Sequence, residues 1–258
     1  HQFFVVLDRC APDLEHFQAV LTTDGTENVD EFVSQIGEES SIGHISTLAV
    51  IEGGAYLVWG QYVGSNMLSN LGSFLGGLEP VLTVEVHPLV YFSSKSELEL
   101  TRLHLRVLKC LKQNPRMSIS EIAEKSGLAP KTVRRALREM EESECVSYKA
   151  RPDLAAGGVV NIHVRIDWDP KRIEISDLIQ WLNEEFPVSF WSPWISASDS
   201  VVFAEFMVED LLEAESISKK IKYTPFVKSC VTLVTYSNAK FPYLAELRLE
   251  EMLQEAGL

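Results

Sequence analysis

The 258-residue sequence predicts an α+β protein in which two ferredoxin-like β-α-β-β-α-β domains flank a winged helix-turn-helix. Three observations lead to this prediction. Four residues near the N-terminus recur 140 positions later: Val6, Pro12, Asp13 and Leu14 against Val146, Pro152, Asp153 and Leu154. Each copy leads into the same order of strand and helix signals. A basic segment with the residue pattern of a helix-turn-helix lies between the two copies.

The first copy reads as β-α-β-β-α-β. β-branched and aromatic residues between turn residues predict its strands, and apolar residues spaced three and four apart predict its helices. The predicted order is strand 17–23, helix 29–36, strands 45–51 and 56–63, helix 66–78 and strand 81–91. Gly53 and Gly54 lie between the central strands, where they predict a hairpin turn or, alternatively, a close approach of a ligand to the backbone.

The second copy repeats this order. It predicts strand 159–166, helix 175–186, strands 189–197 and 201–208, helix 211–221 and strand 230–236. The turn between its central strands is Ser198-Asp199-Ser200. A last amphipathic helix is predicted at 242–256, and it docks either on the sheet or on a partner chain.

Between the copies, the first helix of the basic module is predicted from an apolar stripe at Leu100, Leu103, Val107, Leu108 and Leu111, and Asn114-Pro115 ends it. The sequence Ser118-Ile-Ser-Glu121 is a capping box, which predicts the start of a second helix. Gly127 supplies a turn, because a left-handed backbone costs glycine little.

The third helix of this module begins at Pro130, a residue suited to the first helical position. Val133, Leu137 and Met140 form its core face. Residues 146–151 then read as the strand of a wing.

Charge is distributed unevenly along the chain. Between Thr101 and Arg151 there are 12 Lys or Arg and 6 Asp or Glu, a formal charge of +6, and the other residues carry −20, which together give the −14 of the whole chain. A local reversal of this kind is expected of a nucleic-acid-binding module in an otherwise acidic protein.

Composition narrows the class of protein further. No segment is long and apolar enough to predict a membrane span, and no signal peptide is visible, so we expect a cytoplasmic protein. Cys10, Cys110, Cys145 and Cys230 stand far apart, and we expect them to be small core residues in a reducing compartment. The six histidines are scattered, so we predict no metal site and no cofactor.

The basic module is similar to the DNA-binding domain of Lrp/AsnC-family transcription regulators. The residues that carry the resemblance are Asn114-Pro115-Arg116, Glu121-Ile122-Ala123, Gly127-Leu128, Thr132-Val133-Arg134-Arg135, Leu137, Met140-Glu141 and Val146. Two features depart from the family pattern. Ala129 stands where a serine usually caps the recognition helix, and neither central turn has the family's Gly-x-x-Asp form.

The resemblance implies a tandem of two family units, each a helix-turn-helix followed by a RAM-type, ACT-like effector domain. A first helix-turn-helix is then expected before residue 1. The expected boundaries are a wing or linker remnant at 1–14, effector-like domains at 15–95 and 158–240, the winged helix-turn-helix at 96–157 and a C-terminal helix at 241–258. It also implies a sequence-specific regulator of double-stranded DNA that forms a dimer or higher oligomer through its effector-like sheets, paired within one chain or between chains.

The candidate DNA-contacting residues are Ser118, Lys131, Thr132, Arg134, Arg135 and Arg138. A recognition helix reads base edges with a few side chains while neighbouring cations hold phosphates. The alternative is an ordinary solvated helix face. Glu139 and the acidic residues after it predict where the DNA-facing surface ends.

The resemblance also implies sensing of a small, amino-acid-like effector. Its candidate residues are Gly53, Gly54, Trp191, Trp194 and Asp199. Tryptophans at these positions, and Trp181, either line such a site or an interface, or fill the core. Two other functions stay open: a siroheme-decarboxylase-like enzyme on the same scaffold, and an assembly module with a non-functional helix-turn-helix.

Overall fold

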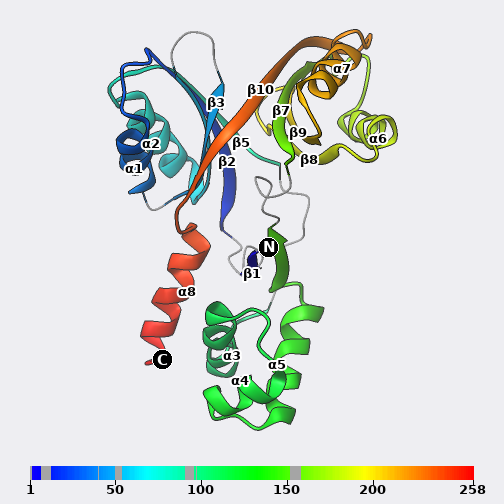
Figure 1. Ribbon diagram of the computed structural model, residues 1–258. Helices are drawn as coiled ribbons and strands as arrows, with labels where there is room; N and C mark the ends of the chain where they lie inside the picture. The colour runs from blue at the N-terminus through cyan, green and yellow to red at the C-terminus, as the bar shows by residue number, and fades with distance from the viewer. Residues whose placement is uncertain are drawn as a thin grey trace. The chain divides into compact units, whose positions relative to one another are not determined.

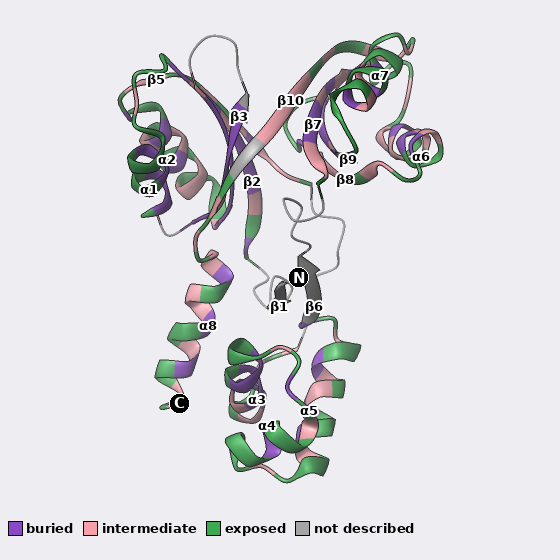
Figure 2. Ribbon diagram, in the orientation of Figure 1, coloured by how far each residue is buried: buried purple, intermediate pink, exposed green. Residues whose placement is uncertain are grey.

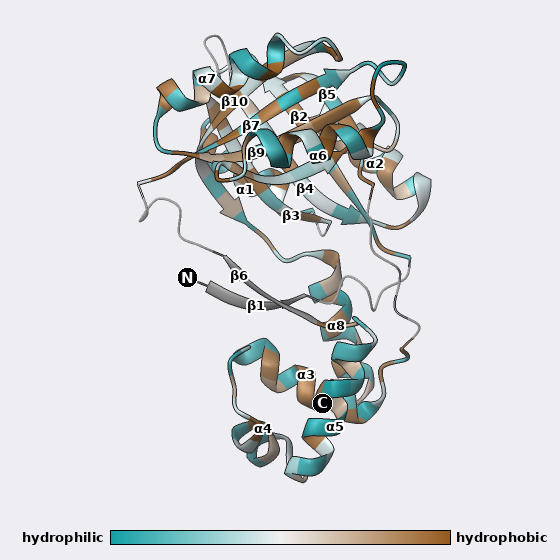
Figure 3. Ribbon diagram, turned by 90° about the vertical axis from the view of Figure 1, so that its right-hand side faces the viewer, coloured by the Kyte–Doolittle hydropathy of each residue, from teal (hydrophilic) through white to brown (hydrophobic). Residues whose placement is uncertain are grey.

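The computed structural model describes residues 2–6, 13–39, 41–49, 54–90, 96, 98–151 and 158–258. The chain divides into two compact units. The helix-turn-helix unit comprises residues 1–14, 92–153 and 242–258, and the sheet unit comprises 15–91 and 154–241. The helices of both units alternate hydrophobic and hydrophilic residues, as expected of elements with one buried face (Figure 3).

Both copies in the sheet unit form the predicted β-α-β-β-α-β order (Figure 1). The first contains β2 (Glu15–Thr23), α1 (Val29–Gly37), β3 (Ile42–Ala49), β4 (Ala55–Tyr62), α2 (Gly64–Gly76) and β5 (Val81–Pro88). The second contains β7 (Val160–Trp168), α6 (Ile175–Glu185), β8 (Phe190–Ile195), β9 (Val201–Val208), α7 (Leu211–Lys222) and β10 (Val227–Lys240). The α+β fold class predicted from the sequence is therefore confirmed.

The two copies share one antiparallel sheet. Its strand order is β5-β2-β4-β3-β10-β7-β9-β8, so each copy contributes four strands in the same relative order. β10 joins the copies, because it pairs with β7 of its own copy and with β3 of the other. This double pairing explains why β10 is 14 residues long, whereas residue types alone predicted only 230–236.

The outer edges of this sheet also meet. Leu89 and Ser196 form a β-bridge, the Val90 N–H donates to the Ile195 carbonyl (2.9 Å), and the Ala197 N–H donates to the Pro88 carbonyl (2.7 Å). The sheet thus closes on itself. In this structure the two copies pair within one chain, which is one of the two arrangements that the sequence left open.

Three apolar clusters hold the sheet unit. α1 and α2 pack on β2, β3 and β4, and α6 and α7 pack on the strands of the second copy. The third cluster lies on the strand faces turned away from the helices and combines both copies: Leu48, Ala55, Leu57, Trp59, Val201 and Phe203. Buried residues accordingly concentrate on the strands (Figure 2), and all eight residues of β4 are buried.

The helix-turn-helix unit contains α3 (Arg102–Gln113), α4 (Ile119–Ser126), α5 (Pro130–Glu142) and a two-stranded sheet of β6 (Ser147–Arg151) and β1 (Gln2–Val6). Leu105, Val107, Leu108 and Leu111 of α3 are buried in its core. Leu103 was predicted to join them but is half-buried, because the helix turns His104 inward instead.

The last helix, α8 (Leu244–Glu255), belongs to this unit as well. Leu249 and Leu253 are buried in the same core as α3. Arg248 donates to both carboxylate oxygens of Asp13 (2.6 and 2.9 Å), and Lys112 of α3 forms an ion pair with Glu250. α8 therefore docks on the helix-turn-helix core, and the expected docking on the sheet is wrong.

The cysteine expectation also needs correction. Cys145 is disulfide-bonded rather than a lone thiol. Among the described cysteines, Cys110 and Cys230 are free, and burial raises the pKa of both thiols. Cys10 and Gly53 lie outside the described residues. No helix in the described part of the chain is long and apolar enough to cross a membrane.

Gly60 provides a test of the sheet packing. A Cβ there would lie 1.9 Å from the Ser41 carbonyl oxygen, a backbone atom that accepts the Gln61 N–H, so the strands would have to move apart. We predict that Gly60→Ala lowers the free energy of unfolding by roughly 1–3 kcal/mol or more in urea denaturation. Gly72→Ala is the control, since its Cβ would make only an ordinary contact with Val86 at 3.6 Å. Equal stability of the two variants would contradict this packing.

Candidate functional site

The helix-turn-helix is built by local signals that the sequence contains. At the start of α4, the Ser118 hydroxyl accepts the Glu121 N–H (3.3 Å) and the Glu121 carboxylate accepts the Ser118 N–H (2.7 Å). The Ser118 hydroxyl and the Ser118 backbone N–H, as hydrogen-bond donors to the carboxylate, lower the pKa of the Glu121 carboxyl. Gly127 ends the helix in the left-handed region at φ 63°, as predicted.

α5 follows with Pro130 in its first turn. Its N-cap, Ala129, is extended (φ −69°, ψ 144°) but has a methyl side chain that cannot accept a hydrogen bond. Val133, Ala136 and Met140 are buried against α3 and α4, so one face of α5 is fixed to the core. The opposite face is therefore presented to solvent.

The predicted DNA-contacting cations all lie on this solvent face. Lys131, Arg134, Arg135 and Arg138 are exposed, and Thr132 is half-buried. Ser118 is exposed at the start of α4. The structure thus brings the candidate cations onto one surface of one helix.

Two of these cations have carboxylate neighbours one turn later. The Arg135 Nε lies 3.4 Å from Glu139, and the Arg138 Nε lies 3.8 Å from Glu142. Exposed pairs of this kind contribute only about 0.3–0.5 kcal/mol, so a phosphate or base edge can replace them. Within the described part of the chain, Lys131 and Arg134 form no ion pair.

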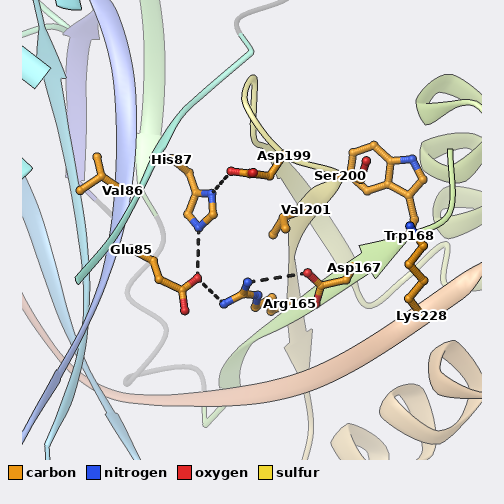
Figure 4. A pocket seen from close by; sticks show the side chains of 10 residues that line it. All are labelled: Glu85, Val86, His87, Arg165, Asp167, Trp168, Asp199, Ser200, Val201 and Lys228. Carbon is orange, nitrogen blue, oxygen red and sulfur yellow. Dashed lines mark hydrogen bonds and ion pairs between the residues drawn. The ribbon is translucent and has the colours of Figure 1, made fainter. Parts of the chain in front are cut away.

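A second candidate site is a pocket of about 410 Å³ in the sheet unit (Figure 4). It lies between β5 of the first copy and β7, the β8–β9 turn and β10 of the second. Its lining contains both signs of charge: Glu85, Val86, His87, Arg165, Asp167, Trp168, Asp199, Ser200, Val201 and Lys228.

His87 and Arg165 organise this pocket. Arg165 donates to Glu85 (2.6 Å) and lies 3.7 Å from Asp167. His87 is buried, with Nδ1 3.2 Å from the Ser196 hydroxyl and 3.5 Å from the Asp199 carboxylate. Its Nε2 has no hydrogen-bond partner among the described residues, although a Glu85 oxygen lies 3.6 Å away. One buried ring therefore links β5 to the β8–β9 turn and keeps one nitrogen available.

The predicted effector residues do not gather at this pocket. Asp199 lines it. Trp194 lies in the inner cluster with Trp59 and donates to Glu205 (3.4 Å), whereas Trp191 is 59% exposed. Gly54 is enclosed by its own copy, because a Cβ there would lie 2.2 Å from Glu27 and 2.5 Å from Thr23.

Trp181 was another residue for which the sequence left a site or a core role open. It packs edge-to-face on Phe186 and Phe226 in the core of the second copy. This position agrees with core filling.

Sequence reasoning missed most of the charged residues of the pocket. Glu85 and His87 alternate along one predicted strand, and Arg165 and Asp167 continue another. Charged residues at alternate strand positions point to one face, and that signal was present, but it did not show that the two strands face each other. Within the described residues, no group of three or more His, Cys, Asp or Glu could hold a metal ion.

Residues 100–147 match the family described as winged helix-turn-helix DNA-binding. The chain therefore contains a winged helix-turn-helix of the DNA-binding class. No curated protein matches the chain in sequence.

Solved structures share the fold. The siroheme decarboxylase NirDL is similar over 99% of this chain and 84% of its own, with a TM-score of 0.61 and 11% identity. LrpC of B. subtilis is similar over 54% of this chain and 96% of its own (TM-score 0.46, 20% identity). AsnC of E. coli is similar over 57% of this chain and 99% of its own (TM-score 0.46, 18% identity).

The N-cap of α4 has a side-chain hydrogen bond and that of α5 has none, so substitutions at the two caps should change stability in opposite directions. Replacing Ala129 by Ser supplies an acceptor to the first turn of α5 and should raise the free energy of unfolding by about 1 kcal/mol. Ser118→Ala removes an existing cap and should lower it by about 1 kcal/mol. Urea denaturation of both variants measures this, and a destabilised Ala129→Ser protein would show that α5 does not begin as described.

Proposed function

We propose that this chain is a transcription regulator of the Lrp/AsnC type that binds double-stranded DNA sequence-specifically through α5. The observation that carries the proposal is the solvent face of α5. Lys131, Arg134, Arg135 and Arg138 are exposed on it, while its other face is buried in the core of a winged helix-turn-helix. A recognition helix requires this division between a fixed face and a cationic face.

The proposed contacts divide by position on α5. Lys131 lies in the first turn, where the uncapped N–H groups of the helix favour a phosphate oxygen. Arg134, Arg135 and Arg138 have planar guanidinium groups that match the two acceptors of a guanine edge. We infer that Lys131 and Thr132 position the helix on the backbone and that one or more of the arginines read bases.

The charge of the rest of the chain favours a local contact. The residues outside 101–151 carry −20, so they repel the phosphate backbone. Binding then depends on the few cations of the helix-turn-helix, and the affinity should fall steeply with salt.

Fluorescence anisotropy with DNA selected from a random pool tests this function. Each lost phosphate contact should reduce the slope of log K against log salt by about 0.9. We predict that changing Lys131, Arg134, Arg135 and Arg138 together to Ala abolishes specific binding and flattens this slope.

The matched control removes the same charge from the other unit by changing Lys171, Lys219, Lys220 and Lys222 to Ala, and it should bind as the unaltered chain does. If the unaltered chain selects no DNA at low salt, the regulator proposal fails and an assembly module is favoured. If the control loses binding equally, the contact is not on α5.

We further infer that the pocket of the sheet unit holds the effector. Its volume of about 410 Å³ lies within the range of small-molecule sites. Cationic Arg165 and Lys228 and anionic Asp199 would suit an amino-acid-like ligand, whose two ends carry opposite charges. In this chain the two effector-like copies already pair with each other. Further chains would therefore associate through another surface of the sheet unit.

A panel of amino acids added during thermal unfolding tests the effector. A ligand at 100 times its Kd should stabilise the chain by about 2.7 kcal/mol. Asp199→Asn should remove this stabilisation, whereas Asp177→Asn, an exposed change on α6, should not. No shift with any amino acid would contradict an amino-acid effector.

The fold similarity to NirDL over nearly the whole chain favours one second candidate, a siroheme-decarboxylase-like enzyme. The pocket argues against it. A tetrapyrrole of the siroheme class carries several carboxylates, and Glu85, Asp167 and Asp199 would repel them. A change in the absorbance spectrum of siroheme on mixing with the chain would support the enzyme instead.

A further inference from the structure

His104 caps the start of α3 through Thr101, and its ring also contacts Glu139 of α5, which capping does not require. Its side chain is buried, and Nδ1 lies 3.1 Å from the backbone nitrogen of Thr101, the N-cap residue. A backbone N–H can only donate, so Nδ1 accepts and the neutral ring carries its proton on Nε2. Nε2 lies 3.0 Å from an oxygen of Glu139 and therefore donates to it.

Glu139 lies on α5 and contacts both His104 and Arg135. One carboxylate oxygen accepts from His104, and the other lies 3.4 Å from the Arg135 Nε. Because the ion pair uses Nε, the terminal Nη groups of Arg135 stay available, and these are the donors that reach a guanine edge. A buried ring on α3 is thus linked through one carboxylate to a base-reading candidate on α5.

A second Arg–Glu pair on α5 provides a comparison for Arg135 and Glu139. Arg138 and Glu142 have the same spacing, but their distance is 3.8 Å and both side chains are about 70% exposed, at 67% and 72%. Within the described residues, Glu142 has no hydrogen bond or ion pair other than this one. The two pairs have the same residue types and spacing, but among the described residues only Glu139 also accepts a hydrogen bond from a buried side chain.

Apart from this pair, the Arg135 side chain is surrounded by solvent and open space. A pocket of about 270 Å³ opens beside it, lined by Thr101, Arg102, Leu103, His104, Arg135, Ala136 and Glu139. A free arginine loses considerable rotamer freedom when it docks on a base. A guanidinium that is already oriented loses less, so it discriminates better between a correct and an incorrect base.

We propose that His104 is a positioning residue for DNA recognition, which orients Arg135 through Glu139. This proposal rests on the proposed DNA-binding function. His104 touches no DNA in this arrangement. Its effect should appear in base discrimination at the one position that Arg135 reads, and not in the affinity for non-specific DNA.

Two substitutions at this position separate positioning from capping. His104→Asn keeps an acceptor near the place of Nδ1 and removes the donor at Nε2, so it keeps the cap and loses the link. His104→Gln places an amide nitrogen near Nε2, so it keeps the link. If His104 positions Arg135, the His104→Asn variant should lose base discrimination and the His104→Gln variant should be nearly normal. If His104 only caps α3, the reverse is expected.

The measurement is the ratio of affinities for the selected DNA and for variants that each carry one changed base pair. We expect Arg135→Ala to lose roughly tenfold or more of this ratio at one position. His104→Asn should lose roughly threefold at the same position, and adding it to Arg135→Ala should change nothing further. Glu139→Gln, a change at a half-buried residue outside the apolar core, should resemble His104→Asn, and Glu142→Gln is its matched control.

Failure of the DNA-binding function and failure of the positioning role would give different results. If the unaltered chain selects no DNA, the proposed function itself falls and this inference with it. If Arg135→Ala loses discrimination while His104→Asn and Glu139→Gln do not, the regulator stands and the positioning role is wrong. Additive effects of His104→Asn and Arg135→Ala would also overturn it, because His104 would then act by another route.

Discussion

Each four-stranded sheet of this protein has two faces, and helices cover only one of them. The other face carries apolar residues that must leave water, and in this chain the two copies cover each other. Leu57 and Trp59 of the first copy meet Phe203 of the second in that shared cluster. The pairing of β10 with β3 and the bridge between Leu89 and Ser196 follow from this packing, because they join the edges of sheets already placed face to face.

Internal pairing also creates the charged pocket. Glu85 and His87 come from the first copy, whereas Arg165 and Asp199 come from the second, so neither copy alone contains the site. A ligand held there would contact both copies. The helix-turn-helix unit is stabilised independently, by the core that α3, α4 and α5 share with α8. Burial of Val133 and Met140 fixes which side of α5 remains exposed, and this exposed side is the surface proposed to contact DNA.

The sequence predicted the features that are set by neighbouring residues. The capping box at Ser118, the left-handed Gly127 and the strand and helix order of both copies all follow from local spacing. Features set by distant residues could not be predicted in this way. Four features depend on tertiary placement: the full length of β10, the burial of Leu253 in the core that contains α3, the disulfide of Cys145, and the contact of His87 with Asp199. On α5, the cations of the candidate DNA site were predicted, but the link from His104 to Glu139 was not, because 35 residues separate them.

The central claim is that DNA contacts the chain locally, on α5 and its surroundings. Photo-crosslinking of a bound, selected duplex followed by identification of the linked peptides tests it most directly. The account predicts cross-links within residues 116–142, concentrated on the segment that contains Lys131, Arg134, Arg135 and Arg138. Cross-links confined to residues 15–90 or 158–241 would contradict it, because those segments belong to the acidic sheet unit.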